Sequence, residues 1–310
     1  MSDTPLVSIV VPAYNLGHYI GATIDSILAQ DYPRVQLIVI DDGSRDDTCE
    51  VLARYTGRLH WESQPNAGQV AAMNRGWAMA QGEILSWIGA DDLLLPDAVS
   101  ASVRELEAHP EAVLTYCDFN QIDPNGRVMR RIRTPDYSYR DMVVKVTCPP
   151  GPGAFFRRSA WQATGPWDAS LRIMLDYDYW LRLGLRGPFV RIPRVLAHYR
   201  MHPGQETFSS MDEGKAAEPV RVITRLFESN ALPEDLPPLK TRALGNAHLV
   251  SAQLHLRAAR YRAAYASMRE AFALCPQNFL SWKAFRLIAN ALFNRTGLKL
   301  LWKVNSLLRK

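Results

Sequence analysis

The sequence predicts an α/β fold in which a mostly parallel sheet carries helices on both faces, followed by a helical C-terminal region. Residues 6–11 and 35–40 are short β-branched runs that end in polar or turn-forming residues, as strands buried on both faces do. Between them, Ile20, Ile24 and Ile27 recur at helical spacing. This alternation of strand and helix predicts a parallel sheet, and the pattern beyond residue 205 is helical.

The remaining elements of the first half continue the alternation. Ser44 and Asp47 have the spacing of a capping box, which predicts a helix that starts there and runs through residue 52. Residues 70–77 carry apolar side chains on one face of a third helix, and the apolar run 83–90 predicts the next strand.

The second half is less regular. Residues 112–119 are typical of a strand, and the turn signal at 123–126 predicts a hairpin that returns through residues 128–132. The further elements expected are a stiff proline-rich loop (148–153), a strand (154–156), a helix around Trp161, a helix from about residue 175 and a strand at 189–192 or 195–198.

The polar stretch 205–219 predicts a domain boundary. We expect one domain over residues 1–205 and a helical C-terminal region over residues 206–310, with a helical hairpin and a basic amphipathic tail. The four cysteines lie far apart and form no C-x-x-C pair, which argues against a zinc site or a disulfide framework.

Basic charge gathers near the C-terminus of this 310-residue chain, whose formal net charge is +5. The tail 279–310 interleaves lysines and arginines with aromatic and apolar residues. It predicts either an amphipathic helix on an anionic membrane surface or a helix docked on the protein's own core. Its aromatics fit helix packing better than stacking on nucleic acid. Without signal-peptide features or an apolar run of about 18 residues, we expect a cytoplasmic protein, peripheral at the inner membrane face if the tail binds lipid.

Polar residues follow three of the predicted strands, at 14–15, 41–42 and 91–92. Ligands of parallel α/β sheets bind at the carboxyl ends of the strands, so one shared site is expected. The adjacent carboxylates of Asp91 and Asp92 suit a hard divalent cation, and such a cation binds a diphosphate. A helix start at Asp92 explains the same pair equally well at this stage.

Taken together, the motifs resemble a known family. Residues 8–15, 39–44, 66–68 with 74–76, and 89–92 are similar, in order and spacing, to the successive motifs of family 2 glycosyltransferases with a Rossmann-like GT-A fold. The resemblance covers about residues 5–205. It implies an inverting transfer of a sugar from a nucleotide-diphosphate sugar to a hydroxyl of a glycan or a polyprenyl-linked glycan, with Mn²⁺ or Mg²⁺ as cofactor.

The resemblance implies roles for the nucleotide-binding residues. Tyr14 lies against the base, Asp41 accepts a hydrogen bond from a base N–H or a ribose hydroxyl, and Arg75 contacts the diphosphate. A turn with a helix cap is the structural alternative for Asp41 and Asp42, and a surface arginine is the alternative for Arg75. The implied set is Pro12, Tyr14, Asn15, Asp41, Asp42, Asn66, Gly68, Arg75, Gly151 and Gly153.

The metal motif departs from the family's common Asp-x-Asp pattern, because Gly89 occupies its first position. Asp91 and Asp92 remain as the implied ligands, and the departure puts strict metal dependence in question. His202 is implied as a further metal ligand or a phosphate contact, with a structural histidine as the alternative.

Residues 175–180 resemble the family's Glu-Asp motif, which supplies the catalytic base at a helix start. Asp176 matches the aspartate, and Leu175 replaces the glutamate. Asp178 is the alternative base, since residues two apart on a helix do not share a face. Capping of the helix by Asp176 is the structural alternative.

Two other functions compete with a glycosyltransferase. A sugar nucleotidyltransferase needs a glycine-rich, lysine-containing loop after the first strand, and residues 12–17 do not form one. Gly89 and Leu175 also allow a non-catalytic scaffold that binds a nucleotide sugar or a glycan on a decayed transferase domain. Turnover of a nucleotide sugar separates this scaffold from an enzyme.

Overall fold

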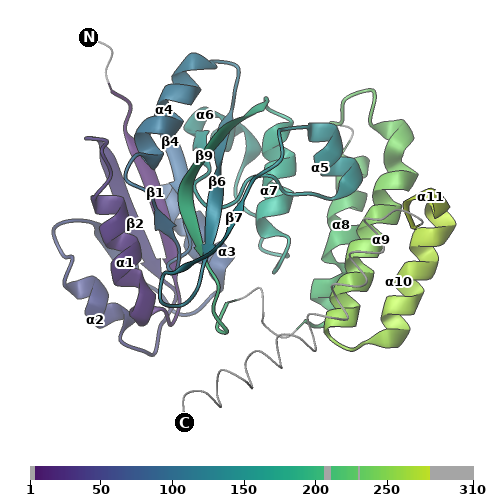
Figure 1. Ribbon diagram of the computed structural model, residues 1–310, viewed down its shortest axis with the longest axis horizontal. Coiled ribbons are helices and arrows are strands. Elements are labelled where there is room, and N and C mark those ends of the chain that lie inside the picture. The colour runs from purple at the N-terminus through teal and green to yellow at the C-terminus, as the bar shows by residue number, and fades with distance from the viewer. Residues whose placement is uncertain (1–3, 206–210, 230, 280–310) are drawn as a thin grey trace. The chain divides into compact units, whose positions relative to one another are not determined.

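The computed structural model describes residues 4–205, 211–229 and 231–279 (Figure 1). The chain divides into two compact units. The first contains residues 1–137, 148–170 and 175–205, and the second contains residues 138–147, 171–174 and 206–310. The chain therefore passes from one unit to the other several times. The predicted basic tail from residue 280 lies outside the described residues.

The first unit is built on a nine-stranded mixed sheet. Its strands are β1 (Val7–Ala13), β2 (Val35–Asp41), β3 (His60–Ser63), β4 (Ile84–Trp87), β5 (Leu93–Leu94), β6 (Leu114–Ile122), β7 (Val128–Ile132), β8 (Phe155–Arg157) and β9 (Phe189–Arg200). Its helices are α1 (Gly17–Leu28), α2 (Thr48–Ala53), α3 (Gln69–Met79), α4 (Ala98–Ala108), α6 (Arg158–Thr164) and α7 (Leu175–Gly184).

The α/β fold class is confirmed, and the parallel part of the sheet is the first half. Strands β3, β2, β1 and β4 lie in that order and pair in parallel. In the second half, β8 runs antiparallel to both β4 and β6, and β5 runs antiparallel to β9. Strands β6 and β9 are parallel. The sheet is therefore mixed rather than mostly parallel.

Helices cover both faces of this sheet, as predicted. Ile20, Ile24 and Ile27 of α1 share a buried cluster with Val7 and Ile9 of β1. On the opposite face, Gly76 of α3 lies against the side chains of Val10 and Ile40, and a Cβ there would come within 2.3 Å of Val10. Alternate β1 residues thus serve two cores, which is why the strand is apolar throughout.

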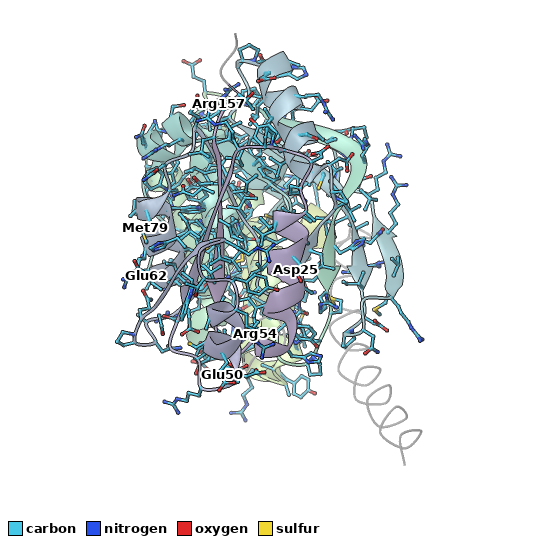
Figure 2. All side chains as sticks on the ribbon, turned by 90° about the vertical axis from the view of Figure 1, so that its left-hand side faces the viewer. Asp25, Glu50, Arg54, Glu62, Met79 and Arg157 are labelled. Carbon is cyan, nitrogen blue, oxygen red and sulfur yellow. The ribbon has the colours of Figure 1, made fainter. Side chains whose placement is uncertain are left out.

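The outer surfaces of α1 and α2 are polar. Asp25 of α1, Glu50 of α2 and Arg54, the residue after α2, are exposed (Figure 2). Ile24 and Leu52, on the inward faces of these helices, are fully buried. The contrast is the amphipathic pattern that the spacing of apolar residues predicts.

The hairpin at 123–126 is confirmed, since β6 and β7 pair antiparallel across it. The last strand is longer than expected, because β9 spans both of the segments that the sequence offered as alternatives. Ile192 pairs with Cys117 and Val195 with Asp118, so Pro193 and Arg194 form an irregularity within one strand. Proline has no N–H to donate to a ladder, which explains the break.

The capping box predicted at Ser44 is wrong. Helix α2 begins at Thr48 with Asp47 as its N-cap, and no side chain caps it. The Ser44 hydroxyl instead accepts a hydrogen bond at 2.8 Å from the backbone N–H of Asn15.

The second unit is helical in the part that the structure describes. It contains α5 (Tyr139–Lys145), α8 (Glu213–Glu228), the short 3-10 helix Pro237–Leu239, α9 (Lys240–Arg257), α10 (Tyr261–Leu274) and α11 (Pro276–Phe279). Helices α9 and α10 follow one another in the chain and pack together. Small residues allow close packing, since a Cβ at Gly245 would lie 3.2 Å from the Cβ of Cys275. Among the described residues, no helix combines the length and hydropathy that a membrane span requires.

Candidate active site

Three loops of the first unit meet at one edge of the sheet. Strands β1, β2 and β4 are parallel, so their carboxyl ends share that edge. Residues 12–15 end β1, Asp41 ends β2, and residues 88–92 follow β4. The arrangement predicted from the sequence, with these motifs at neighbouring strand ends, is the one the structure has.

Asp41 is fully buried, and its partners come from β3, from α2 and from the loop that follows β2. Its Oδ2 accepts a hydrogen bond from the Ser63 hydroxyl at 2.6 Å and lies 3.3 Å from the Cys49 thiol. The backbone N–H of Ser44 points at both carboxylate oxygens, each at 3.3 Å. These contacts hold the loop that follows β2.

Asp42 fastens the loop that precedes α3. Its Oδ1 accepts hydrogen bonds from Gln64 Nε2 at 2.8 Å and from the Ala67 N–H at 2.9 Å, and its Oδ2 accepts one from the Gly68 N–H at 2.8 Å. Gly68 has φ 89°, a left-handed conformation that favours glycine. The Asn66–Gly68 turn thus depends on a carboxylate 24 or more residues earlier in the chain.

The other predicted nucleotide-binding residues lie around these two loops. Pro12 lies within β1 opposite Ile40, and Tyr14 is 45% exposed. Asn15 has φ 52°, and its Oδ1 accepts a hydrogen bond from the Arg45 N–H at 2.7 Å.

Two more predicted nucleotide-binding residues lie at the surface. Asn66 is exposed. The Arg75 side chain is 46% exposed, and its guanidinium pairs with Glu62 of β3.

Asp91 and His202 form a direct pair. The Nε2 atom of His202 lies 2.9 Å from Oδ2 of Asp91, and Gln205 Nε2 lies 3.4 Å from the same oxygen. The His202 side chain is 6% exposed and that of Asp91 15%. Two residues 111 positions apart are thus brought to one point by the return of β9.

The Asp92 carboxylate has a different environment. Its Oδ1 accepts a hydrogen bond from the backbone N–H of Arg200 at 2.8 Å, so it fastens the end of β9. Burial, and then repulsion from Asp91, raise the pKa of Asp92 well above its ordinary value. Helix α4 begins only at Ala98 with Asp97 as its N-cap, so Asp92 does not cap it.

Helix α1 supports this turn with two residues, Tyr19 and Thr23, that the sequence analysis did not select. The Thr23 hydroxyl is fully buried, within hydrogen-bond distance of the carbonyl oxygens of Ala90 (2.9 Å) and Asp92 (2.8 Å). The ring of Tyr19 lies 4.8 Å from that of His202, and the Arg200 guanidinium lies 4.9 Å from the same Tyr19 ring. A threonine on an apolar helix face was the one available signal.

Gly89 has a packing reason to be glycine. A Cβ at this position would come within 2.6 Å of Asp91 Oδ1 and 3.3 Å of Asp92 Oδ2. A side chain at this first position of the metal motif would therefore come too close to the carboxylates of Asp91 and Asp92.

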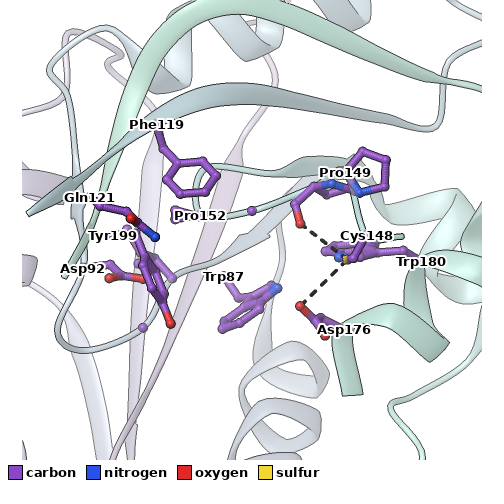
Figure 3. A pocket seen from close by; sticks show the side chains of 14 residues that line it. Trp87, Asp92, Phe119, Gln121, Cys148, Pro149, Pro152, Asp176, Trp180 and Tyr199 are labelled. Atoms are coloured by element: carbon purple, nitrogen blue, oxygen red, sulfur yellow. Dashed lines mark hydrogen bonds between the residues drawn. The ribbon is translucent and has the colours of Figure 1, made fainter. Parts of the chain in front are cut away.

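A pocket of about 300 Å³ opens between the Asp91–Asp92 turn and α7. Figure 3 shows Asp92 and Tyr199 on one side of it, Asp176 and Trp180 on the other, and Trp87 between them. Its size is at the lower end for a small-molecule site. The lining consists of Trp87, Ile88, Gly89, Asp92, Phe119, Gln121, Cys148, Pro149, Pro150, Gly151, Pro152, Asp176, Trp180 and Tyr199.

Asp176 lies in the first turn of α7 and borders the pocket. Its Oδ1 accepts a hydrogen bond from the Tyr177 N–H at 2.7 Å, and its Oδ2 lies 4.0 Å from the Cys148 thiol. Burial raises the pKa of the Asp176 carboxyl above its ordinary value, although backbone N–H groups oppose the change. A partly desolvated carboxylate aimed into a pocket is well suited to accept a proton.

Asp178 is held elsewhere. Arg182 Nε donates a hydrogen bond to its Oδ2 at 2.9 Å, while the same guanidinium bonds the carbonyl oxygens of Thr164 and Pro166. Asp178 does not line the pocket. The two aspartates, two positions apart, point in different directions, as expected for a helix.

The two predicted loop glycines also differ. Gly151 lines the pocket, and a Cβ there would meet the Phe119 ring at 2.8 Å. Gly153 has φ 81° and packs on the side chains of Cys117 and Ala197.

The fit of this site to a divalent cation rests on two donors. In the part of the chain that the structure describes, no three His, Cys, Asp or Glu side chains gather into a ligand set. The carboxylate of Asp91 and the imidazole of His202 do converge, and both are accepted by Mn²⁺. Such a pair fits a cation whose remaining ligands come from a bound diphosphate and water.

Comparison with known proteins agrees with this geometry. Residues 8–164, half of the chain, match the model of Glycosyl transferase family 2. An uncharacterised glycosyltransferase of Rickettsia typhi is 30% identical over 219 residues, which are 68% of each chain. Chondroitin synthase of Escherichia coli is 29% identical over 216 residues, 68% of this chain but only 31% of that protein.

Solved structures show the same fold at low sequence identity. S. aureus TarS 1-349, in complex with UDP-GlcNAc, is 16% identical with a TM-score of 0.62, over 88% of this chain and 92% of that one. The mannosyltransferase PcManGT from Pyrobaculum calidifontis, in complex with GDP-Man and Mn²⁺, is 20% identical with a TM-score of 0.62, over 97% and 88%. The chain is thus a glycosyltransferase with a GT-A-type fold, and it belongs to glycosyl transferase family 2.

Proposed function

We propose that this enzyme transfers a sugar from a nucleotide-diphosphate sugar to a hydroxyl group of a glycan, with inversion at the anomeric carbon. The observation that carries the proposal is the shared pocket, with Asp176 on one side and the Asp91–Asp92 turn on the other. A donor whose diphosphate lies at that turn presents its anomeric carbon toward Asp176.

Each step then follows from one group of the chain. The acceptor hydroxyl oxygen attacks the anomeric carbon while the bond from that carbon to the diphosphate oxygen breaks. Asp176 accepts the proton that the hydroxyl loses, which raises the nucleophilicity of the oxygen. Attack on the side opposite the leaving diphosphate inverts the configuration.

The leaving group lies at the other end of the pocket. Asp91 and His202 would hold a divalent cation, Mn²⁺ or Mg²⁺, which supplies positive charge to the departing diphosphate. The Asp92 carboxylate is bonded to Arg200, so we assign it to fastening β9 rather than to direct ligation. The pairing of Arg75 with Glu62 must open if the guanidinium is to reach the diphosphate.

The nucleotide occupies the loops after β1 and β2. The exposed ring of Tyr14 offers a face to the base. Because the Asp41 carboxylate is buried and bonded by Ser63, we propose that it acts on the nucleotide through the loop that it holds. Asp42 acts in the same way on the Asn66–Gly68 turn.

Aromatic side chains suit a carbohydrate acceptor. Trp87, Phe119 and Tyr199 line the pocket together and offer apolar faces to sugar rings. We retain a glycan, or a glycan on a lipid carrier, as the acceptor class. Contact of residues 279–310 with an anionic membrane stays a prediction, since almost all of this segment lies outside the described residues.

A donor screen tests the proposal. Purified protein is incubated with UDP-GlcNAc, GDP-mannose and other UDP- and GDP-sugars, with and without Mn²⁺. The screen measures the thermal unfolding midpoint and the release of nucleoside diphosphate. We expect one donor class to raise the midpoint and to release its diphosphate slowly by hydrolysis. Binding without release or transfer, with any acceptor glycan, would favour the non-catalytic scaffold.

A further inference from the structure

A buried carboxylate in the second unit accepts hydrogen bonds from three consecutive backbone N–H groups. Glu218 of α8 is 1% exposed. Its Oε1 accepts a hydrogen bond from the Arg172 N–H at 2.7 Å, and its Oε2 accepts hydrogen bonds from the N–H groups of Ile173 (2.8 Å) and Met174 (3.0 Å). Arg221, one turn along the same helix, lies 3.6 Å from Oε1.

Burial of this carboxylate costs free energy, which its hydrogen bonds must offset. A carboxylate loses its hydration when it is buried, and an apolar side chain fills a core position without that cost. Residues 172–174 form no helix or strand of their own. Without Glu218, their three N–H groups would lose these partners. The carboxylate therefore fixes the path of a segment that no regular structure fixes.

The segment leads directly to the proposed base. Met174 is followed by Leu175, the first residue of α7, and then by Asp176. The three N–H groups that Glu218 binds lie immediately before the first turn of that helix, so Glu218 holds the backbone that leads into it. The peptide chain alone carries this constraint from Met174 to Asp176.

We propose that Glu218 is a positioning residue for Asp176, acting through the backbone of residues 172–174. The proposal rests on the function proposed above, in which Asp176 is the base. The role is indirect, because Glu218 is not among the residues that line the pocket. A displacement of about 1 Å at a catalytic group is enough to reduce turnover about 100-fold. Donor binding depends on other loops and is expected to stay unchanged.

The test compares Glu218→Gln with the wild-type, full-length protein. Glutamine keeps the shape, but it loses the charge and replaces one accepting oxygen by an NH₂ group. We expect kcat for diphosphate release to fall at least tenfold, while KM for the donor and the affinity for UDP or GDP stay within twofold. Amide hydrogen exchange at residues 172–174 should accelerate at the same time.

Two further variants keep the result interpretable. Glu228→Gln, on the exposed side of the same helix, should leave kcat unchanged. If Glu218→Gln does not fold, Glu218→Asp keeps the charge with a shorter reach and should show the same selective loss of kcat. An unchanged kcat in the variant that folds, or a parallel loss of nucleotide affinity, would overturn the proposal.

The outcomes also separate this proposal from the proposed function. If the wild-type protein releases no diphosphate from any donor, the function fails, and with it the role of Glu218. If the wild type turns over and Asp176→Asn does not, but Glu218→Gln is as active as wild type, only the positioning role fails.

Discussion

At the scale of single residues, the proposed chemistry depends most on Asp176. Its carboxyl borders the pocket, while the neighbouring candidate Asp178 is occupied by Arg182. We expect Asp176→Asn to bind the donor with unchanged affinity and to lose roughly 10² to 10⁴ in turnover, the usual contribution of a positioned base. Isothermal titration with the nucleotide and a release assay measure the two quantities. Asp178→Asn, the matched control, should keep most of its turnover. The reverse order would transfer the role to Asp178.

The pH dependence follows from the direction of the Asp176 pKa. Burial raises this pKa, and the base works only when deprotonated, so kcat should rise with pH through an acid limb above the ordinary aspartate value of about 3.9. A carboxyl whose pKa is raised in the folded state stabilises the protein while it is protonated. This contribution to the free energy of unfolding is lost as pH rises through that range. Asp176→Asn should therefore remove the acid limb and raise the unfolding midpoint at neutral pH. A lower midpoint in this variant would contradict the stated direction.

Gly89 gives a third residue-scale prediction. Gly89→Asp restores the common Asp-x-Asp pattern, but its Cβ would lie 2.6 Å from Asp91 Oδ1. We expect the variant to displace Asp91 and to weaken Mn²⁺-dependent turnover rather than to improve it. Activity measured across a Mn²⁺ titration tests this. Gly21→Ala in α1, where a Cβ meets only ordinary contacts of 3.5 Å or more, is the control. Tighter Mn²⁺ dependence in Gly89→Asp would show that the turn can adapt.

At the scale of elements, α1 supports the Asp91–Asp92 turn through Thr23. Thr23→Val keeps the shape and removes the hydroxyl that lies between the carbonyl oxygens of Ala90 and Asp92. We expect a loss of about 1–3 kcal/mol in the free energy of unfolding, because buried carbonyl groups lose their partner. Urea denaturation measures it. Thr56→Val, whose hydroxyl bonds an exposed carbonyl, should cost much less. Equal losses of unfolding free energy in the two variants would contradict the prediction, because burial of the carbonyl groups would then have no effect.

The elements also show what a sequence can predict. Strands β1, β2 and β4 and the β6–β7 hairpin were predictable because each has a local signal, an apolar run or a turn sequence. The short strand β3 was not predicted, since His60–Ser63 contains no apolar run. The antiparallel insertion of β8 between β4 and β6 was not, since strand order depends on partners far along the chain. Ser44 failed as a cap because its hydroxyl bonds Asn15, 29 residues away.

Some residues of the candidate site could likewise be predicted from the sequence, and others could not. Asp91, Asp176 and His202 stand in motifs that can be read from the sequence. Thr23 and Glu218 do not, because their partners lie 44 or more residues away and are backbone groups.

At the scale of the whole molecule, the two units are interleaved in sequence. Residues 138–147 and 171–174 belong to the second unit, where Asn246 bonds the Val144 carbonyl and Glu218 bonds residues 172–174. A fragment of residues 1–205 leaves these groups without partners. We expect it to unfold at a lower temperature than the full chain and to lose turnover more than nucleotide affinity. Scanning calorimetry and the release assay measure both. A fragment as stable and active as the full chain would contradict this prediction.

The interleaving also bears on how such enzymes are recombined. In a chimaera that joins the N-terminal 205 residues to the helices of a relative, residues 138–147 and 171–174 still come from this chain. Their partners in the second unit would come from the relative and would not match them. A workable graft must carry α5 and the tetrapeptide before α7 along with the helices, or re-match both by mutation. The boundary between the two units is therefore discontinuous in sequence, and a chimaera with a single crossover point does not respect it.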